Sequence, residues 1–228
     1  MSPLIHNGWL KDLGIDAEYD RFHIPDGSFA KALKDLEKRD LFGLNVTLPH
    51  KAAALAAASE KGEAAAKIGA ANTLSRTQIG GWRADSTDAP GFMRSLAHVR
   101  PDELRALILG AGGSARAIVF ALTNAGIPAT ILNRTTTKAE ALAREFDPIS
   151  AQFGSLDQLT EYIDSATIVI NTTSIGYSGD ILRLPNGHDR VFYDISYGEI
   201  SAGQLAHARE KGWTVKDGLD MLIAQAAF

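Results

Sequence analysis

An apolar run followed at once by a glycine-rich turn constrains the fold more than any other stretch of the chain. Residues 104–109 predict a buried strand, and residues 114–125 predict a helix. Gly110 allows the tight bend between them, and Gly112 lets the backbone approach a pyrophosphate at the helix N-terminus. The pattern alone is weak, but the strand and the helix supply the context it needs; a glycine-rich turn that binds nothing is the alternative. The predicted dinucleotide-binding turn consists of Gly110, Ala111, Gly112, Gly113, Ser114 and Ala115.

Strands and helices alternate through the rest of this half of the chain, which predicts a parallel, doubly wound sheet. Such a sheet binds its ligands at the carboxyl ends of its strands. The further strands are expected at residues 129–132, 167–170, 191–195 and 213–215, and the further helices at 138–146, 156–163 and 204–211.

The residues after the second strand of this half indicate which dinucleotide is bound. An NAD site would carry Asp or Glu there, to bond the ribose 2′-hydroxyl. This chain has Asn133, Arg134 and Thr135 instead, and a guanidinium beside a hydroxyl suits a 2′-phosphate. Lys138 adds positive charge. The sequence therefore favours NADP, the alternative being that Arg134 is simply solvated.

A polar loop follows the strand at 167–170, at the edge of the sheet where ligands are expected. Thr172, Thr173 and Ser174 are predicted to line the nicotinamide ribose, although an ordinary polar loop would have the same composition.

A lysine stands in an unusual place in the first half. Asn45 and Thr47 lie near the end of a short predicted strand, Pro49 stops that strand, and Lys51 opens an alanine-rich helix. The positive end of a helix dipole repels an ammonium there, which favours release of its proton and so a role in proton transfer. The alternative is that Lys51 points into water.

The other elements of the first half follow from apolar periodicity and turn residues. Ser2 is expected to cap the first helix, with Pro3 at its first position. Residues 99–103 are the expected linker to the second half. Helices are predicted at 4–13, 29–36, 52–58, 88–98 and 219–228, and strands at 18–24, 41–44, 71–75 and 80–84.

Composition excludes several classes of protein. The 228 residues suffice for one large or two small domains, and the net charge of −4 argues against nucleic-acid binding. The chain has no cysteine, and its six histidines lack metal-ligand spacing, so no metal is expected. No apolar run approaches membrane-spanning length and no signal peptide is visible, so a cytoplasmic enzyme without membrane partners is the default expectation.

The order of the polar motifs along the chain resembles the shikimate dehydrogenase family. The motifs are S-P-x-I-H-N, G-x-N-V-T-x-P-H-K, G-A-x-N-T, T-D-x-x-G-F, G-A-G-G-x-A-R-A, N-R-T, I-N-T-T-S-x-G and G-x-x-M-L-x-x-Q-A-A. Singly, the polar residues of the first half are the usual caps and turn formers, so each motif alone is ambiguous.

The resemblance implies a two-domain α/β enzyme that oxidises the 3-hydroxyl of shikimate to 3-dehydroshikimate with NADP, and runs the reverse reduction in aromatic amino-acid biosynthesis. It implies that Lys51 and Asp88 are the catalytic pair. The shikimate-binding domain would be residues 1–98 with 218–228, and the Rossmann-type NADP domain 99–217, in a monomer or homodimer. The implied substrate-binding residues are Ser2, Asn45, Thr47, Asn72, Tyr197 and Gln225, and Gly218 joins the cofactor residues.

The chain departs from the family pattern at its ends. The first strand and an upstream serine of the family are missing, and the chain stops at Phe228, which indicates a fragment or a misassigned start, the alternative being a weakened relative of the family. Ser86 stands where the family usually has asparagine. Three alternatives stay open: a dehydrogenase that prefers quinate or accepts NAD, a non-catalytic ligand sensor on the same fold, and an unrelated dinucleotide-binding domain.

Overall fold

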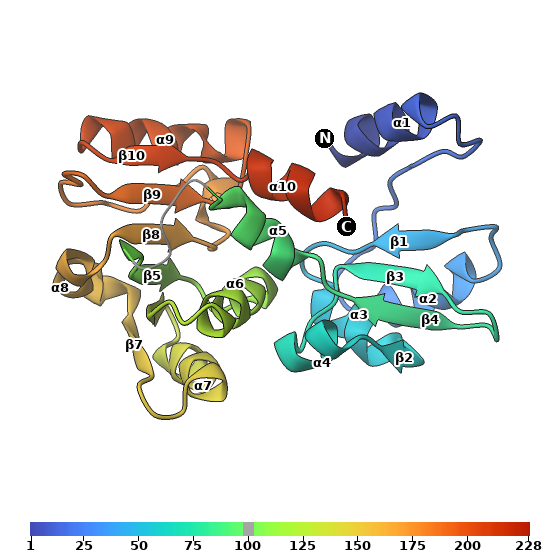
Figure 1. Cartoon of the computed structure of the whole chain (residues 1–228), viewed down its shortest axis with the longest axis horizontal. Coiled ribbons are helices and arrows are strands. Elements are labelled where there is room, and N and C mark those ends of the chain that lie inside the picture. The colour runs from blue at the N-terminus through green and yellow to red at the C-terminus, as the bar shows by residue number, and fades with distance from the viewer. Residues whose placement is uncertain (98–102) are drawn as a thin grey trace. The chain divides into compact units, whose positions relative to one another are not determined.

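The computed structural model describes residues 1–97 and 103–228, which form two compact units (Figure 1). The first unit combines Met1–Thr87 with Leu222–Phe228, and the second is Asp88–Met221. The predicted two-domain α/β class is confirmed. The second unit begins before the expected boundary at residue 98, and the assignment of binding roles to the two parts stays a prediction. The expected linker, 99–103, lies outside the described residues except for Glu103.

The second unit is built on a six-stranded sheet in the order β10-β9-β8-β5-β6-β7, with every neighbouring pair parallel. Consecutive strands run outward from β5 to one edge and from β8 to the other, so the strand order reverses between β5 and β8. In open α/β sheets the ligand crevice lies at this switch point. The strands are β5 Ala106–Leu109, β6 Ala129–Asn133, β7 Gln152–Ser155, β8 Ile168–Asn171, β9 Val191–Asp194 and β10 Thr214–Lys216.

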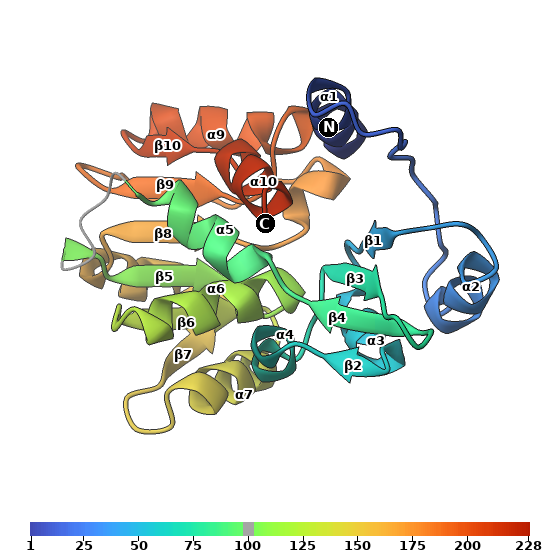
Figure 2. The ribbon, with the colours of Figure 1, turned by 45° about the vertical axis from the view of Figure 1, so that its right-hand side comes forward.

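Helices cover both faces of this sheet. Figures 1 and 2 show α5 and α6 side by side, and they pack against each other. Leu107, Val169 and Phe192 on the other face pack with Leu205 of α9 in one apolar cluster. The helices are α5 Asp88–Ser95, α6 Gly113–Asn124, α7 Thr136–Phe146, α8 Leu159–Tyr162 and α9 Glu199–Glu210, with short 3-10 turns at Leu156–Gln158, Ile163–Ser165 and Ile175–Ser178. The chain then enters α10 Leu219–Ala226, which spans the division between the units.

The first unit has a four-stranded sheet in the order β1-β3-β4-β2. The β1-β3 and β3-β4 pairs are antiparallel, and β2 runs parallel to β4. Phe29, Leu33, Val46 and Trp82 are central to its apolar core. Its elements are α1 Ser2–Asp12, α2 Phe29–Leu36, β1 Gly43–Asn45, α3 Lys51–Ala57, β2 Glu60–Lys61, α4 Glu63–Ile68, β3 Thr73–Arg76 and β4 Trp82–Asp85.

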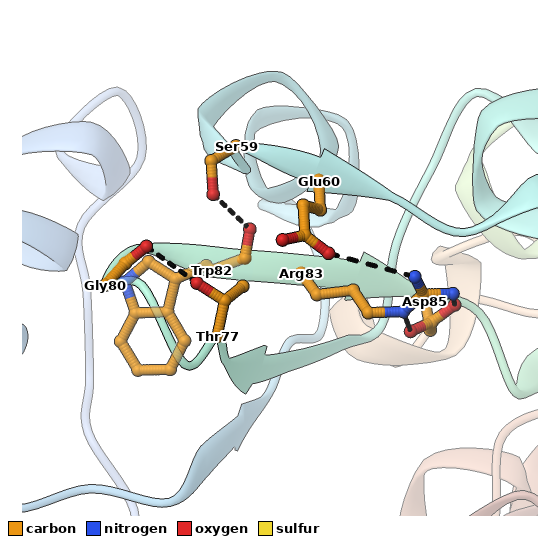
Figure 3. A network of polar contacts seen from close by, with 7 residues as sticks. All are labelled: Ser59, Glu60, Thr77, Gly80, Trp82, Arg83 and Asp85. Carbon is orange, nitrogen blue, oxygen red and sulfur yellow. Dashed lines mark hydrogen bonds and ion pairs between the residues drawn. The ribbon is translucent and has the colours of Figure 1, made fainter.

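Polar contacts hold β2 beside β4 (Figure 3). The Ser59 hydroxyl donates to the carbonyl of Trp82 at 3.1 Å. The Arg83 guanidinium donates to Asp85 at 2.9 Å and lies 4.0 Å from the Glu60 carboxylate. These contacts fix the end of β4, and the chain continues from there through Ser86 and Thr87 into α5.

The predicted strand at 18–24 is wrong, because this segment is irregular in the structure. Within residues 1–97 no neighbouring strand offers it a ladder, and side chains satisfy part of its backbone instead. The Asn7 amide donates to the carbonyl of Tyr19 at 3.0 Å and accepts from its N–H at 2.7 Å. His50 Nε2 lies 2.8 Å from the carbonyl oxygen of Ile24.

Some boundaries also differ from expectation. Met1, and not Ser2, is the N-cap of α1, so Ser2 and Pro3 both lie in its first turn. The short elements β2, α4 and β7 were not predicted, and α9 begins at Glu199 and not at residue 204.

Among the described residues, no helix is both long enough and apolar enough to cross a lipid bilayer.

Candidate functional site

The glycine turn lies at the switch point of the six-stranded sheet. Gly110 follows the fully buried strand β5 and adopts φ +110° while its N–H donates to Leu132 at 2.7 Å. A Cβ on Gly110 would run into Thr172 Oγ1, and that hydroxyl itself donates to Leu109 at 2.8 Å. Only glycine therefore fits at this bend between the ends of β5 and β8.

The start of α6 has the form of a phosphate site. Gly112 is the N-cap of this helix, and a Cβ on it would meet no atom within 4 Å, so its backbone is open to a ligand. The first N–H groups of a helix have no partner within the helix, and they attract an anion. Ala115 is fully buried, which packs the helix closely onto the sheet. These features of Gly112, Gly113, Ser114 and Ala115 fit a dinucleotide pyrophosphate.

The predicted NADP-selective residues gather at the end of β6. Asn133 is the last residue of the strand, and its amide donates to the carbonyl of Thr135 at 3.0 Å. Thr135 is the N-cap of α7, and the exposed cations of Arg134 and Lys138 lie on either side of it in sequence. Two cations at a helix N-terminus fit a second phosphate group.

A buried polar pair joins the ends of β8 and β9. Asn171 is 1% exposed and Asp194 is 2% exposed, and the Asn171 amide donates to Asp194 Oδ2 at 2.9 Å. Burial raises the pKa of Asp194, hydrogen bonds from Ser196 and Asn171 oppose that rise, and the negative charge of Asp217 adds to it. The sequence interpretation assigned neither residue of the pair a role.

Two residues of the predicted site follow the ends of β9 and β10. Tyr197 is half-buried, and burial together with the neighbouring Tyr177 raises its pKa. Gly218 donates its N–H to the carbonyl of Ser196 at 2.9 Å, and a Cβ at this position would collide with the carbonyl of Ile195. Close backbone packing therefore demands glycine at 218.

In the first unit, side chains far apart in sequence meet around Asn72. Asn72 is 4% exposed, and its amide nitrogen donates to Gln225 Oε1 at 2.9 Å and to Thr87 Oγ1 at 2.9 Å. Its amide oxygen accepts the N–H of Thr87 at 2.9 Å. The structure thus brings Asn72 and Gln225 together as one polar group. It adds Thr87, which the sequence interpretation did not single out although it precedes Asp88 in the quoted motif.

The remaining predicted substrate residues lie near the amino-terminal elements. Asn45 ends β1, and its Oδ1 accepts the Tyr19 hydroxyl at 3.1 Å. Burial raises the pKa of this tyrosine. Thr47 is exposed, its carbonyl accepts the N–H of His50, and Ser2 is half-buried in the first turn of α1.

Lys51 and Asp88 are each the first residue of a helix. Lys51 opens α3, and its carbonyl accepts the N–H of Ala71 at 2.9 Å. The preceding His50 is buried and stacks on Phe29 with ring centroids 5.3 Å apart, which anchors the start of α3. Asp88 opens α5 and is buried. A helix N-terminus favours the carboxylate and disfavours the ammonium, so the two groups are in opposite electrostatic settings.

In the part of the chain that the structure describes, no group of three or more His, Asp or Glu side chains could hold a metal ion. The functional groups of the candidate site are amides, hydroxyls, the cations of Lys51, Arg134 and Lys138, and the buried carboxylates of Asp88 and Asp194.

A six-stranded parallel sheet with a glycine turn at its switch point defines a dinucleotide-binding protein of the doubly wound class. Comparison with known proteins narrows this class. The model of the shikimate dehydrogenase substrate binding domain matches residues 1–74, and that of shikimate / quinate 5-dehydrogenase matches residues 95–186. The chain belongs to the shikimate dehydrogenase family, as the motif order predicted.

Individual relatives cover the whole chain. Shikimate dehydrogenase (NADP(+)) of Hyphomonas neptunium is 45% identical over 100% of this chain and 84% of its own. The crystal structure of shikimate dehydrogenase from Aquifex aeolicus is 32% identical with a TM-score of 0.85, over 99% of this chain and 84% of that one. The Thermus thermophilus shikimate 5-dehydrogenase in complex with NADP(H) and shikimate is 34% identical with a TM-score of 0.84, over 99% and 85% of the two chains.

Proposed function

We propose that this chain is an NADP-dependent shikimate dehydrogenase, which reversibly reduces 3-dehydroshikimate to shikimate in aromatic amino-acid biosynthesis. The observation that carries the proposal is the 45% identity, over the full chain, to a curated shikimate dehydrogenase (NADP(+)). The Thermus thermophilus relative, solved with NADP(H) and shikimate, supports both the substrate and the cofactor.

The cofactor is held at three places along the strand ends of the second unit. Gly112 and Gly113 at the α6 N-terminus would hold the pyrophosphate, and Arg134 with Lys138 would hold the 2′-phosphate. The loop at Thr173 faces the nicotinamide end. The bound cofactor would supply the acceptor for the hydride that leaves the carbinol carbon of shikimate.

Lys51 and Asp88 handle the proton that the substrate hydroxyl loses. The oxidation releases one proton from that hydroxyl, and Lys51 accepts it as the general base. Lys51 is the first residue of α3, and in the reverse reduction it returns the proton to the substrate oxygen as the general acid. Asp88, the buried first residue of α5, is the second member of the pair and orients the substrate hydroxyl.

The polar group around Asn72 binds the substrate hydroxyls. Asn72, Thr87 and Gln225 exchange hydrogen bonds of 2.9–3.2 Å with one another, so each is held in a fixed orientation. Fixed donors and acceptors of this kind select a polyhydroxylated ring over an apolar one. Asn45, Thr47, Ser2 and Tyr197 complete the substrate contacts.

The test is the reduction of NADP⁺, followed by absorbance, with shikimate as substrate and with quinate and NAD⁺ as comparisons. We expect turnover with shikimate and NADP⁺, and loss of most of kcat with a modest change of KM in Lys51→Ala. Lys61→Ala is the matched control, because Lys61 is an exposed lysine of the same unit and has no proposed role. A folded wild-type protein without turnover, or a Lys51→Ala variant with normal kcat, contradicts the assignment.

One observation favours a second candidate, a dehydrogenase that also accepts quinate. The family model matched by residues 95–186 is described as shikimate / quinate 5-dehydrogenase. The ratio of kcat/KM for the two substrates decides between the candidates.

We also propose that the enzyme acts in the cytoplasm as a monomer or homodimer, without nucleic-acid or membrane partners. The net charge of −4 supports the absence of nucleic-acid binding. Sedimentation of the purified protein tests the oligomeric state, and fractionation of cells tests the compartment.

A further inference from the structure

A buried hydrogen-bond relay crosses the ends of β8 and β9. Asp194 Oδ2 accepts the Asn171 amide at 2.9 Å, while Asp194 Oδ1 accepts both the N–H of Ser196, at 2.9 Å, and its hydroxyl. Asn171 Oδ1 in turn accepts the N–H of Thr173 at 3.1 Å and its hydroxyl at 2.7 Å. Each oxygen of the two buried side chains accepts at least one hydrogen bond, and a fully satisfied network of this kind makes its surroundings rigid.

The relay connects segments that the proposed function uses. Thr173 lies in the loop assigned to the nicotinamide end of the cofactor. Ser196 precedes Tyr197, and its carbonyl accepts the N–H of Gly218 at 2.9 Å. Asn171 and Asp194 are register partners on adjacent parallel strands, so they stand between two loops that follow different strands. Neither of the pair is exposed enough to be an efficient ligand contact itself.

We propose that Asn171 and Asp194 are positioning residues that hold the Thr173 and Ser196 loops in the geometry needed for hydride transfer, an inference that rests on the proposed function. The proposed phosphate contacts, at the start of α6 and at Arg134, follow strands β5 and β6, whereas the side-chain hydrogen bond of the pair joins β8 to β9. Loosening the pair should therefore disturb the nicotinamide end more than the phosphate contacts. Small displacements of reacting groups lower kcat by large factors.

The direction of the hydrogen bonds supplies a stringent test. In Asp194→Asn the new amide oxygen must face Ser196, because Ser196 donates hydrogen bonds to this position. The new NH₂ group then points at the NH₂ group of Asn171, and neither can accept a hydrogen bond. In Asn171→Asp two carboxylates oppose each other. In the double swap, Asn171→Asp with Asp194→Asn, the amide at 194 donates to the carboxylate at 171, and that carboxylate still accepts from Thr173. The swap restores the pattern of donors and acceptors without changing the net charge.

The experiment compares wild type, both single variants and the swap in two assays. Steady-state turnover is normalised to the NADP⁺ binding stoichiometry, so unfolded protein does not count. The fluorescence of bound NADPH reports the nicotinamide environment without any turnover. We expect each single variant to lower kcat about tenfold or more. The dissociation constant of NADP⁺ should change less than about threefold, because the phosphate contacts stay. The swap should recover most of the kcat and of the fluorescence.

Gln204→Glu is the matched control. Gln204 is also about 1% exposed and exchanges two hydrogen bonds with Leu182, but it lies on α9. Gln204→Glu places a carboxylate oxygen against the carbonyl oxygen of Leu182. The variant should therefore have a lower melting temperature and an unchanged normalised kcat. If Asn171→Asp does not fold, Asp194→Asn and the swap carry the test, with Ser196→Ala as a milder loss of one donor.

The outcomes distinguish a failure of the proposed function from a failure of the positioning role. Wild type that binds NADPH but does not oxidise shikimate refutes the proposed function, and the fluorescence comparison still decides the role of the pair. Single variants with wild-type kcat and fluorescence overturn the positioning role, as does a swap that is as impaired as the two single variants combined.

Discussion

A methyl group added at Gly110 should destabilise the fold, whereas a methyl group added at Gly112 should weaken cofactor binding. The two glycines flank Ala111 in the same turn, so the same substitution tests two different properties of the site. At Gly110 the backbone has φ +110°, and the added Cβ meets Thr172 Oγ1. At Gly112 φ is −88°, and the Cβ meets no protein atom within 4 Å.

The expected costs follow from these surroundings. Holding alanine at an unfavourable positive φ costs about 1–3 kcal/mol. Displacing Thr172 Oγ1 from its 2.8 Å bond to Leu109 adds about 1 kcal/mol. Gly110→Ala should therefore lower the melting temperature by roughly 4–16 °C in a chain of this size. Gly112→Ala costs about 0.5 kcal/mol at an N-cap, or roughly 2 °C.

Gly112→Ala should weaken cofactor binding strongly, although it hardly changes the stability of the fold. Its Cβ projects into the space that we propose for the pyrophosphate, so the dissociation constant for NADP⁺ should rise about tenfold or more, a loss of about 1.4 kcal/mol. Thermal unfolding without cofactor and titration calorimetry with NADP⁺ measure the two quantities separately. A Gly112→Ala variant that binds NADP⁺ as tightly as wild type refutes the role of this turn. A Gly110→Ala variant of unchanged stability refutes the argument from strain.

Three further predictions concern single contacts. Burial raises the pKa of Tyr193, and its hydroxyl lies 2.9 Å from that of Ser95. Because the Ser95 hydroxyl donates to the carbonyl of Phe92 at 2.7 Å, we infer that Tyr193 donates to Ser95. Ser95→Ala should therefore destabilise the fold more than Tyr193→Phe, by about 1–3 against about 1 kcal/mol in denaturant titrations, and the reverse order would contradict this. Burial lowers the pKa of His6, so the unfolded chain binds the proton more readily; the stability present above about pH 6.5 should fall as the pH drops below it, and less so in His6→Phe. Arg134→Ala should raise the KM for NADP⁺ about tenfold or more and leave that for NAD⁺ nearly unchanged, and an equal rise in both would remove Arg134 from the 2′-phosphate site.

The second unit was largely predictable from sequence because its local signals agree with its global fold. The run at β5 is buried at every position, as expected for a central parallel strand, and glycine follows it directly. Strand β7 was missed because Gln152–Ser155 contains no apolar run, and only pairing with β6 makes it a strand. The early start of α9 at Glu199 was missed because Gly198 was not interpreted as its N-cap.

The first unit was harder because its elements are short and depend on distant partners. The segment at 18–24 has the composition of a strand, but a strand forms only where a neighbour supplies hydrogen bonds. In residues 1–97 the segment is bonded instead by the side chains of Asn7 and His50. The two-residue strand β2 depends equally on context, since its pairing with β4 is supported by the Arg83 contacts to Glu60 and Asp85.

The site shows where motif order stops being informative. The motifs identified Asn72 and Gln225 as members of one site, but their bond joins residues 153 positions apart and depends on α10 returning to the first unit. The Asn171–Asp194 bond depends on the register of two parallel strands, which no local pattern specifies. Asn171 stands inside the motif I-N-T-T-S-x-G, and Asp194 stands three residues before Tyr197, so both lie close in sequence to residues assigned to the site. A motif therefore contains both the groups that meet the ligand and the buried groups that orient them, and only the hydrogen-bond partners distinguish the two kinds.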